Sequence, residues 1–155
     1  MADLVAGHLS RAKKVVDLFA GSGSFALRLA RKAEVHAVEG DGPALLALDR
    51  GFRFAAGLKR VTGERRDLFR RPLIPAELNR FGAVIVDPPR AGAEEQVAQL
   101  AASDTPVIAY VSCNPASFAR DAKLLVDGGY TLDWVQPVGQ FRWSTHVELA
   151  GRFSK

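Results

Sequence analysis

The chain has 155 residues, of which 48% are hydrophobic and 25% are charged, and its formal net charge is +4. This length suits one globular domain with its own core and is too short for two. No apolar run approaches the length of a membrane span, and the first ten residues lack the basic start and apolar middle of a signal peptide. We therefore expect a cytoplasmic protein with a single domain over residues 1–155.

Cysteine and histidine are scarce. Cys113 is the single cysteine, which excludes an internal disulfide and a cysteine-rich metal or iron–sulfur site within this chain. The three histidines, His8, His36 and His146, lack the paired spacing of metal ligands. We therefore expect no metal, and we interpret each histidine as a surface or partly buried polar residue.

The first predicted unit is a strand, a glycine turn and a helix. Residues 2–12 are predicted to form a short helix or arm, and residues 1–14 are consistent with the remnant of a longer N-terminal region. The run from Val15 to Phe19 is apolar and β-branched, which predicts a strand buried on both faces. Gly21 and Gly23 follow, and apolar residues then recur at helical spacing, namely Phe25, Ala26, Leu29, Ala30 and Ala33. Such a turn is a candidate nucleotide or cofactor site, because its helix offers free N–H groups.

Strands and helices alternate along the rest of the chain. Further strands are expected at residues 35–39, 60–65, 81–86, 106–111, 130–135 and 145–149. Helices are expected from Pro43 to about Gly57, as one turn within residues 70–79, after Arg90 with Glu94 and Glu95 in the first turn, and from the N-cap Asn114 to about Gly128.

This order of elements predicts a fold class. Five alternations followed by two successive strands predict a Rossmann-like, doubly wound α/β fold with a mostly parallel seven-stranded sheet and a closing antiparallel hairpin. Ligands bind such sheets outside the carboxyl ends of the strands. The candidates at predicted strand ends along that edge are Gly21, Glu39, Asp67, Asp87 and Cys113. We therefore expect the functional site there.

Basic residues are concentrated between Arg50 and Arg71, where eight of them stand against two acidic residues. Such a segment forms either a solvated face beside an edge strand or a patch that faces the phosphates of a nucleic acid. The charge alone does not decide between these alternatives.

The glycine turn allows two cofactors. Gly21-x-Gly23-x-x-Ala26 is a weak match to the dinucleotide fingerprint, with Glu39 at about the right distance to accept hydrogen bonds from ribose hydroxyls, so a nicotinamide cofactor is one interpretation. The stretch from Asp17 to Gly23 also resembles the first motif of S-adenosylmethionine-dependent methyltransferases, which has an acid inside the strand. The resemblance implies that S-adenosylmethionine is the cofactor.

In that interpretation, Glu39 takes the ribose hydroxyls and Asp67 accepts from the adenine amino group. Asp67 has a structural alternative, which is a loop carboxylate that pairs with Arg65, Arg66 or Arg70. The residues that the resemblance places around the cofactor are Asp17, Phe19, Gly21, Gly23, Ser24, Glu39, Asp67 and Asp87.

Three further motifs occur in a specific order: Asp87-Pro88-Pro89-Arg90, Ser112-Cys113-Asn114-Pro115 and His146-Val147-Glu148. Together they resemble the RNA uracil-C5 methyltransferases, which make 5-methyluridine in transfer and ribosomal RNA, and the resemblance covers about residues 15–148. It implies that Cys113 is the nucleophile that attacks carbon 6 of uracil and that Glu148 is the base that removes the proton from carbon 5. It also implies that Asp87 lies between cofactor and base and that Arg90 lies near the substrate.

Other interpretations of these residues remain. Taken singly, a cysteine placed as Cys113 is more often a small apolar filler after a strand than a nucleophile, and a glutamate placed as Glu148 is usually a solvated strand residue. Residues 1–14 lack the glutamine that the family usually carries ahead of the first strand, and residues 139–145 replace its acidic, proline- and histidine-containing run. We therefore expect the catalytic domain of an RNA uracil-C5 methyltransferase acting on tRNA or rRNA. The alternatives are a cofactor-binding module that is inactive without missing RNA-binding segments, or a methyltransferase for another acceptor.

Overall fold

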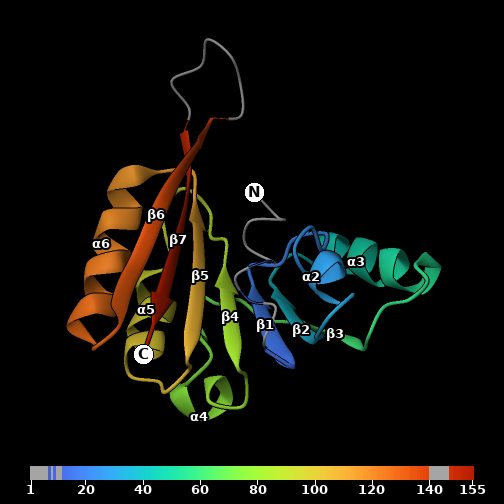
Figure 1. Ribbon diagram of the computed structural model, residues 1–155. Helices are drawn as coiled ribbons and strands as arrows, with labels where there is room; N and C mark the ends of the chain where they lie inside the picture. The colour runs from blue at the N-terminus through green and yellow to red at the C-terminus, as the bar shows by residue number, and fades with distance from the viewer. Residues whose placement is uncertain (1–6, 8, 10–11, 140–146) are drawn as a thin grey trace.

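The computed structural model describes residues 7, 9, 12–139 and 147–155. These residues form a seven-stranded sheet flanked by helices (Figure 1). The strands are β1 (Lys14–Leu18), β2 (Glu34–Glu39), β3 (Val61–Arg65), β4 (Ala83–Val86), β5 (Val107–Ser112), β6 (Thr131–Gly139) and β7 (Val147–Ser154). The helices are α2 (Ala26–Leu29), α3 (Gly42–Phe54), α4 (Pro75–Leu78), α5 (Glu94–Ala101) and α6 (Pro115–Asp127).

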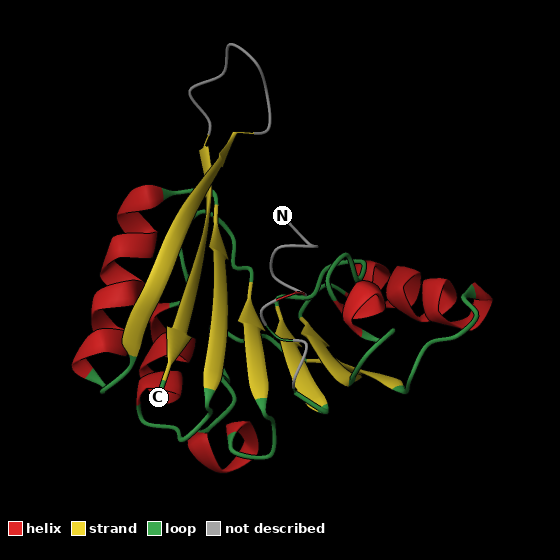
Figure 2. Ribbon diagram, viewed as in Figure 1, coloured by secondary structure: helices red, strands yellow, loops and turns green. Residues whose placement is uncertain are grey.

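The strand order is β3-β2-β1-β4-β5-β7-β6. Strands β1 to β5 pair in parallel, and β7 runs antiparallel between β5 and β6. The chain therefore winds outward from β1 to β3 and returns to β4 on the other side of β1 (Figure 2). This reversal is the topological switch point, where open α/β sheets bind ligands. The predicted doubly wound sheet and its antiparallel hairpin are confirmed.

The core has one cluster on each face of the sheet. Alternate strand residues point to opposite faces, so that Val15 and Ile85 pack with α2 and α3, whereas Val16 and Val84 pack with α5 and α6. Asp17 lies between Val16 and Leu18, and therefore points to the face that carries α2. In Figure 1, α2 and α3 cover the β1–β3 part of the sheet and α5 and α6 lie at the other side.

Several predicted boundaries differ from the structure. The helix after β1 has only four residues, Ala26–Leu29, and α3 ends at Phe54 because Ala55 is extended. Strand β6 continues to Gly139 and β7 continues to Ser154. The apolar pattern failed for the last two strands because β6 is an edge strand with mostly exposed residues, while Gly151 and Arg152 interrupt the apolar run of β7.

Some predictions fall on parts of the chain that are not described. The expected helix or arm over residues 2–12 lies largely outside the described residues, as do His8, His146 and residues 140–145. Within residues 12–139 and 147–155, no helix is long and apolar enough to cross a membrane.

Candidate active site at the carboxyl edge of the sheet

The turn after β1 has an unusual backbone that leaves an open space beside it. Phe19, Gly21 and Gly23 all have positive φ angles, of 61°, 54° and 93°. A Cβ on Gly21 would meet no atom within 4 Å, whereas one on Gly23 would lie 2.9 Å from Leu48 of α3. Gly23 is therefore required by packing, while Gly21 and the exposed Ser24 border open space at the carboxyl end of β1.

Glu39, at the end of β2, ties this turn to the start of α3. Its Oε2 accepts a hydrogen bond from the Gly21 backbone N–H at 2.8 Å, and its Oε1 accepts one from the Asp41 N–H at 2.8 Å. Each carboxylate oxygen can accept a second bond. Glu39 is therefore held in a fixed position and retains acceptor capacity for a pair of hydroxyl groups.

Asp17 is completely buried, and neither of its carboxylate oxygens has a hydrogen-bond partner in the structure. Burial, together with the negative charges of nearby Asp87 and Glu39, raises the pKa of Asp17 to about 8, and the neighbouring backbone N–H of Ala26 partly offsets this rise. A buried carboxyl without a partner is costly when it is ionised. A bound cation at this point would lower that cost, because it would give the carboxylate a counter-charge.

Asp87 follows β4 and links this acidic group to the end of β7. Burial raises the pKa of Asp87 to about 6, and the negative charge of Glu148 adds to the rise. The two carboxyl groups, which are 61 residues apart in sequence, are thus close enough to interact electrostatically. Asp87 therefore interacts electrostatically with both Asp17 and Glu148.

A cavity of about 380 Å³ lies at this edge. It is bordered by the ends of β1 to β4, and its walls include Phe19, Glu39, Asp67, Phe69 and Asp87. The rings of Phe19 and Phe69 meet at 5.3 Å and provide an apolar wall beside the carboxylates. The cavity therefore combines an apolar aromatic wall with hydrogen-bond acceptors, a combination that suits a nucleoside.

Asp67 partly adopts the structural role that the sequence left open. Its Oδ1 accepts the backbone N–H groups of Phe69 and Arg70 at 3.0 and 3.3 Å, and its Oδ2 lies 3.7 Å from the exposed Arg70 guanidinium. Asp67 still lines the cavity, so this turn fixes a half-exposed carboxylate at the cavity wall.

Two arginines of the basic segment form ion pairs with carboxylates that lie just outside it. Arg66 donates to both carboxylate oxygens of Glu77, at 2.8 and 3.1 Å, which holds the pKa of Glu77 below its usual range. Arg53 pairs with Asp49 one helical turn away. Exposed basic residues nevertheless remain at both ends of β3, among them Arg60, Arg65 and Arg71.

At the end of β5 and the start of β7, the strand register brings Cys113 and Glu148 together. Ser112 of β5 pairs with Leu149 of β7 in antiparallel register, so the next residues along each strand are Cys113 and Glu148. Cys113 is a free, exposed thiol. Leu149 packs against the core on the α5 and α6 face, which leaves Glu148 on the opposite face, the one that carries Asp17.

The structure therefore places the sequence candidates along one edge, at the carboxyl ends of β1 to β5 and at the start of β7. Arg90 is exposed, and its backbone oxygen accepts hydrogen bonds from Asn114 and Ser117 of the segment after Cys113. The sequence analysis did not predict Phe69 as a site residue, although it lines the cavity. The available signal was an aromatic residue two positions after Asp67. Among the described residues, no group of three or more His, Cys, Asp or Glu side chains could hold a metal ion.

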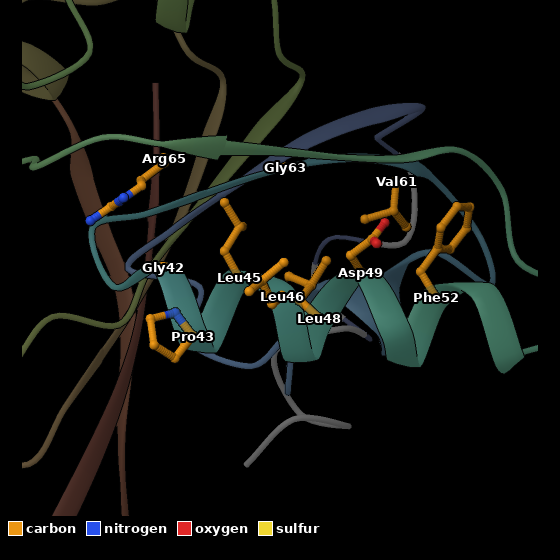
Figure 3. Close-up of a pocket in the computed structure, with 10 residues that line it drawn as sticks. All are labelled: Gly42, Pro43, Leu45, Leu46, Leu48, Asp49, Phe52, Val61, Gly63 and Arg65. Atoms are coloured by element: carbon orange, nitrogen blue, oxygen red, sulfur yellow. The ribbon is translucent and has the colours of Figure 1, made fainter.

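A larger cavity of about 570 Å³ lies away from these residues (Figure 3). It is a groove between α3 and the edge strand β3, lined mainly by Leu45, Leu46, Phe52 and Val61, with Arg65 at one end. None of the candidate site residues lines it, and its walls carry few polar groups. We therefore do not assign the cofactor to this groove.

The residues at the sheet edge fit S-adenosylmethionine. The orphaned carboxylate of Asp17 suits a cationic ligand, Glu39 suits a ribose diol, and the cavity wall of Phe19 and Phe69 suits an adenine ring. The acidic character of the edge disfavours the pyrophosphate of a nicotinamide dinucleotide, because Asp17, Glu39 and Asp87 would repel it.

Comparison with known proteins agrees with this geometry. Residues 53–154 match the sequence profile of the tRNA (uracil-5-)-methyltransferase family. The chain belongs to this family.

Relatives and solved structures extend the comparison. The chain is 65% identical over 155 residues to an RNA methyltransferase of Mesorhizobium japonicum, and 43% identical over 146 residues to a 23S rRNA (uracil(1939)-C(5))-methyltransferase of Pseudomonas fluorescens. It superposes with a TM-score of 0.84 on the Pyrococcus abyssi tRNA (uracil-54, C5)-methyltransferase, solved with S-adenosyl-L-homocysteine, at 30% identity. The matches cover 100%, 91% and 98% of this chain, but only 38%, 31% and 36% of those proteins.

Proposed function

We propose that the chain is the catalytic domain of a cytoplasmic RNA uracil-C5 methyltransferase that uses S-adenosylmethionine and modifies a uridine in tRNA or rRNA. The domain spans residues 1–155 in this proposal. The observation that carries it is the placement of Cys113, Glu148 and Asp87 at adjoining strand ends beside a cavity that suits the cofactor. Membership of the tRNA (uracil-5-)-methyltransferase family supports the same acceptor chemistry.

Cofactor binding is assigned to the β1–β3 side. Asp17 would face the ammonium group, Glu39 the ribose hydroxyls and Asp67 the adenine amino group, while Phe19, Gly21, Gly23 and Ser24 shape the turn around them. When bound, S-adenosylmethionine supplies an electrophilic methyl group on its sulfonium. The solved relative from Pyrococcus abyssi holds the demethylated product, S-adenosyl-L-homocysteine, which supports this assignment.

The acceptor chemistry is assigned to Cys113 and Glu148. The thiolate of Cys113 bonds to carbon 6 of uracil, and the electron pair of the C5–C6 bond moves to carbon 5, which becomes nucleophilic and takes the methyl group. Glu148 then removes the proton from carbon 5, the C5–C6 double bond reforms and the thiolate leaves. Asp87 would accept a hydrogen bond from the N3–H of uracil, and Arg90 would contact the RNA.

The basic segment offers a surface along which the RNA would reach the site. Arg65, Arg70 and Arg71 are exposed close to the carboxyl edge, where they can neutralise phosphates. This surface is small for a structured RNA, and the relatives are about 2.6 to 3.0 times as long as this chain. The alternative function, a cofactor-binding module that needs further segments to grip RNA, therefore has a specific observation in its favour.

The experiment is a covalent trap. The chain is incubated with S-adenosylmethionine and RNA that carries 5-fluorouridine, because fluorine at carbon 5 cannot be removed as a proton and the adduct persists. Two RNAs serve as arms: a 23S rRNA fragment around position 1939 and a tRNA arm around position 54. We expect an RNA–protein adduct whose mass includes one added methyl group, and none with Cys113→Ser or with unmodified uridine.

The outcomes separate the alternatives. Binding of S-adenosyl-L-homocysteine without any adduct would favour the inactive module. An adduct that persists in Cys113→Ser would assign the nucleophile to another residue. Absence of any cofactor binding in calorimetry would contradict both functions.

A further inference from the structure

The loop that follows Asp87-Pro88-Pro89 is held by helix α6 through four contacts with its backbone. The Arg90 oxygen accepts from Asn114 Nδ2 and Ser117 Oγ, both at 3.1 Å. The oxygen of Ala91 accepts from Arg120 at 3.0 Å, and the N–H of Ala93 donates to Asp121 Oδ2 at 2.8 Å. The side chains Asn114, Ser117, Arg120 and Asp121 therefore form a clamp on residues 90–93.

Gly92 shows how closely this loop approaches the helix. Its φ angle is +84°, and a Cβ at this position would lie 2.5 Å from Arg120 and 2.7 Å from Asp121. Both contacts are below the distance at which carbon atoms pack. The loop backbone therefore lies directly on the two charged side chains.

Asp121 connects this clamp to the sheet. Its side chain is 0% exposed, and the Tyr110 hydroxyl of β5 donates to Oδ2 at 2.5 Å. Burial and this hydrogen bond raise the pKa of Tyr110, so the hydroxyl remains protonated and continues to donate. Arg120 donates to Oδ1 at 2.7 and 2.9 Å, which neutralises the buried charge. One carboxylate thus joins β5, α6 and the loop.

We propose that Asp121 is a positioning residue for the acceptor side of the reaction: it fixes residues 90–93 against α6 and so sets the position of Arg90 relative to Cys113. This inference rests on the proposed function. Arg90 begins the clamped loop, and Cys113 immediately precedes Asn114, the N-cap that holds the Arg90 oxygen. Without the Asp121 carboxylate, a buried N–H and a buried hydroxyl lose their acceptor, and the loop must move to satisfy them.

The test compares three variants of the chain. Asp121→Asn keeps the shape but removes the charge, and Tyr110→Phe removes only the hydroxyl. Tyr130→Phe is the matched control, because Tyr130 is also buried and its hydroxyl donates to the Thr105 oxygen at 2.8 Å, at the opposite end of the sheet. The readouts are amide hydrogen exchange of residues 91–93, affinity for S-adenosyl-L-homocysteine and the rate of adduct formation with 5-fluorouridine RNA.

We expect faster exchange at residues 91–93 and an adduct rate at least about tenfold lower in Asp121→Asn and Tyr110→Phe, since small displacements of reacting groups cost this much or more. The affinity for S-adenosyl-L-homocysteine should change less than about twofold, because a merely structural defect would weaken it together with the rate. The control should match the wild type in all three readouts.

Two results would overturn the inference. Unchanged exchange at residues 91–93 in both variants would mean that Asp121 does not hold the loop. Faster exchange with a normal adduct rate would mean that the loop does not position the reacting groups. If the wild-type chain forms no adduct, the proposed function fails, whereas the exchange readout still decides whether Asp121 fixes the loop.

Discussion

The two halves of the sheet edge satisfy their polar groups in opposite ways. At the ends of β1 and β2, the buried carboxylate of Asp17 has no hydrogen-bond partner. At the ends of β4 and β5, the buried carboxylate of Asp121 has three, from Tyr110, Arg120 and the backbone of Ala93. A buried carboxyl without partners keeps its proton until a ligand supplies a counter-charge, whereas one with partners holds the chain itself in place. The first half therefore leaves a polar group for a ligand to pair, and the second half pairs its polar groups within the chain.

The largest effect is expected from Glu148 on the acceptor side. Glu148→Gln removes the proposed base but keeps the side-chain shape, so the rate of product release should fall by about 10²- to 10⁴-fold. The enzyme should then accumulate as a covalent adduct with ordinary uridine RNA, because the last elimination is blocked. Denaturing gel analysis measures this adduct. A normal rate of product release would show that another group removes the proton.

The next largest effect is expected for Asp17→Asn, which should weaken ligand binding but increase the stability of the ligand-free chain. Asp17→Asn should weaken S-adenosyl-L-homocysteine binding by about 50-fold, since a hydrogen bond to a charged group contributes about 1.5–3 kcal/mol. It should also stabilise the ligand-free chain at pH 8, because it removes a buried charge. Calorimetry and chemical denaturation measure the two quantities.

The pH dependence of stability sharpens this prediction. The folded chain retains the Asp17 proton up to a pKa of about 8, whereas an unfolded chain releases it near the ordinary value of 3.8. The folded state therefore binds more protons in this range, and its free energy of unfolding falls as the pH rises from about 4 to 8, by up to about 5 kcal/mol from this group. Asp87 contributes in the same direction up to about pH 6. Asp17→Asn should flatten the profile, and an identical profile would contradict the buried, unpartnered carboxyl.

Glu39 should have an intermediate effect because it serves both the turn and the ligand. In Glu39→Gln, one backbone N–H of the pair Gly21 and Asp41 would face an amide donor instead of an acceptor. We expect about tenfold weaker S-adenosyl-L-homocysteine binding and a loss of about 1–2 kcal/mol in stability. Glu34→Gln, at the exposed start of the same strand, is the matched control and should change neither quantity.

The smallest effect on ligand binding is expected from Glu77, which pairs with Arg66 of the basic segment. Glu77→Gln disrupts the hydrogen bonds from Arg66 and should lower the free energy of unfolding by about 1–2 kcal/mol. The affinity for S-adenosyl-L-homocysteine should stay within twofold, because Glu77 does not line the cavity. A strong loss of affinity would mean that Arg66, which does line it, is positioned for the ligand by this pair.

The fold could be predicted where strands are buried on both faces. The apolar run is unbroken in β4, spans most of β5 and is interrupted in β1 only by Asp17, so the positions of these strands and the edge formed by their ends follow from the sequence. The same reasoning fails for β6 and β7, since exposed residues and Gly151 carry no such pattern and their pairing is decided by neighbours distant in sequence.

Many residues of the site could be predicted from the sequence, but the hydrogen bonds that hold them in place could not. The motifs and strand ends indicated Glu39 and Asp87, but the bond from Glu39 to Gly21 spans 18 residues and appears only after folding. Asp121 was missed altogether, because an aspartate in an amphipathic helix is ordinarily exposed. It is buried here because Tyr110 and Ala93, distant in sequence, supply its partners.

Amide hydrogen exchange with and without S-adenosyl-L-homocysteine tests the contrast between the two halves most directly. The ligand should slow exchange strongly in residues 18–24 and 39–42, because it would pair the Asp17 carboxyl and bind Glu39 beside them. Residues 91–93 should be protected to the same degree in both states, because α6 already holds them. Equal protection of the first half without ligand, or a gain of protection confined to residues 91–93, would contradict the account.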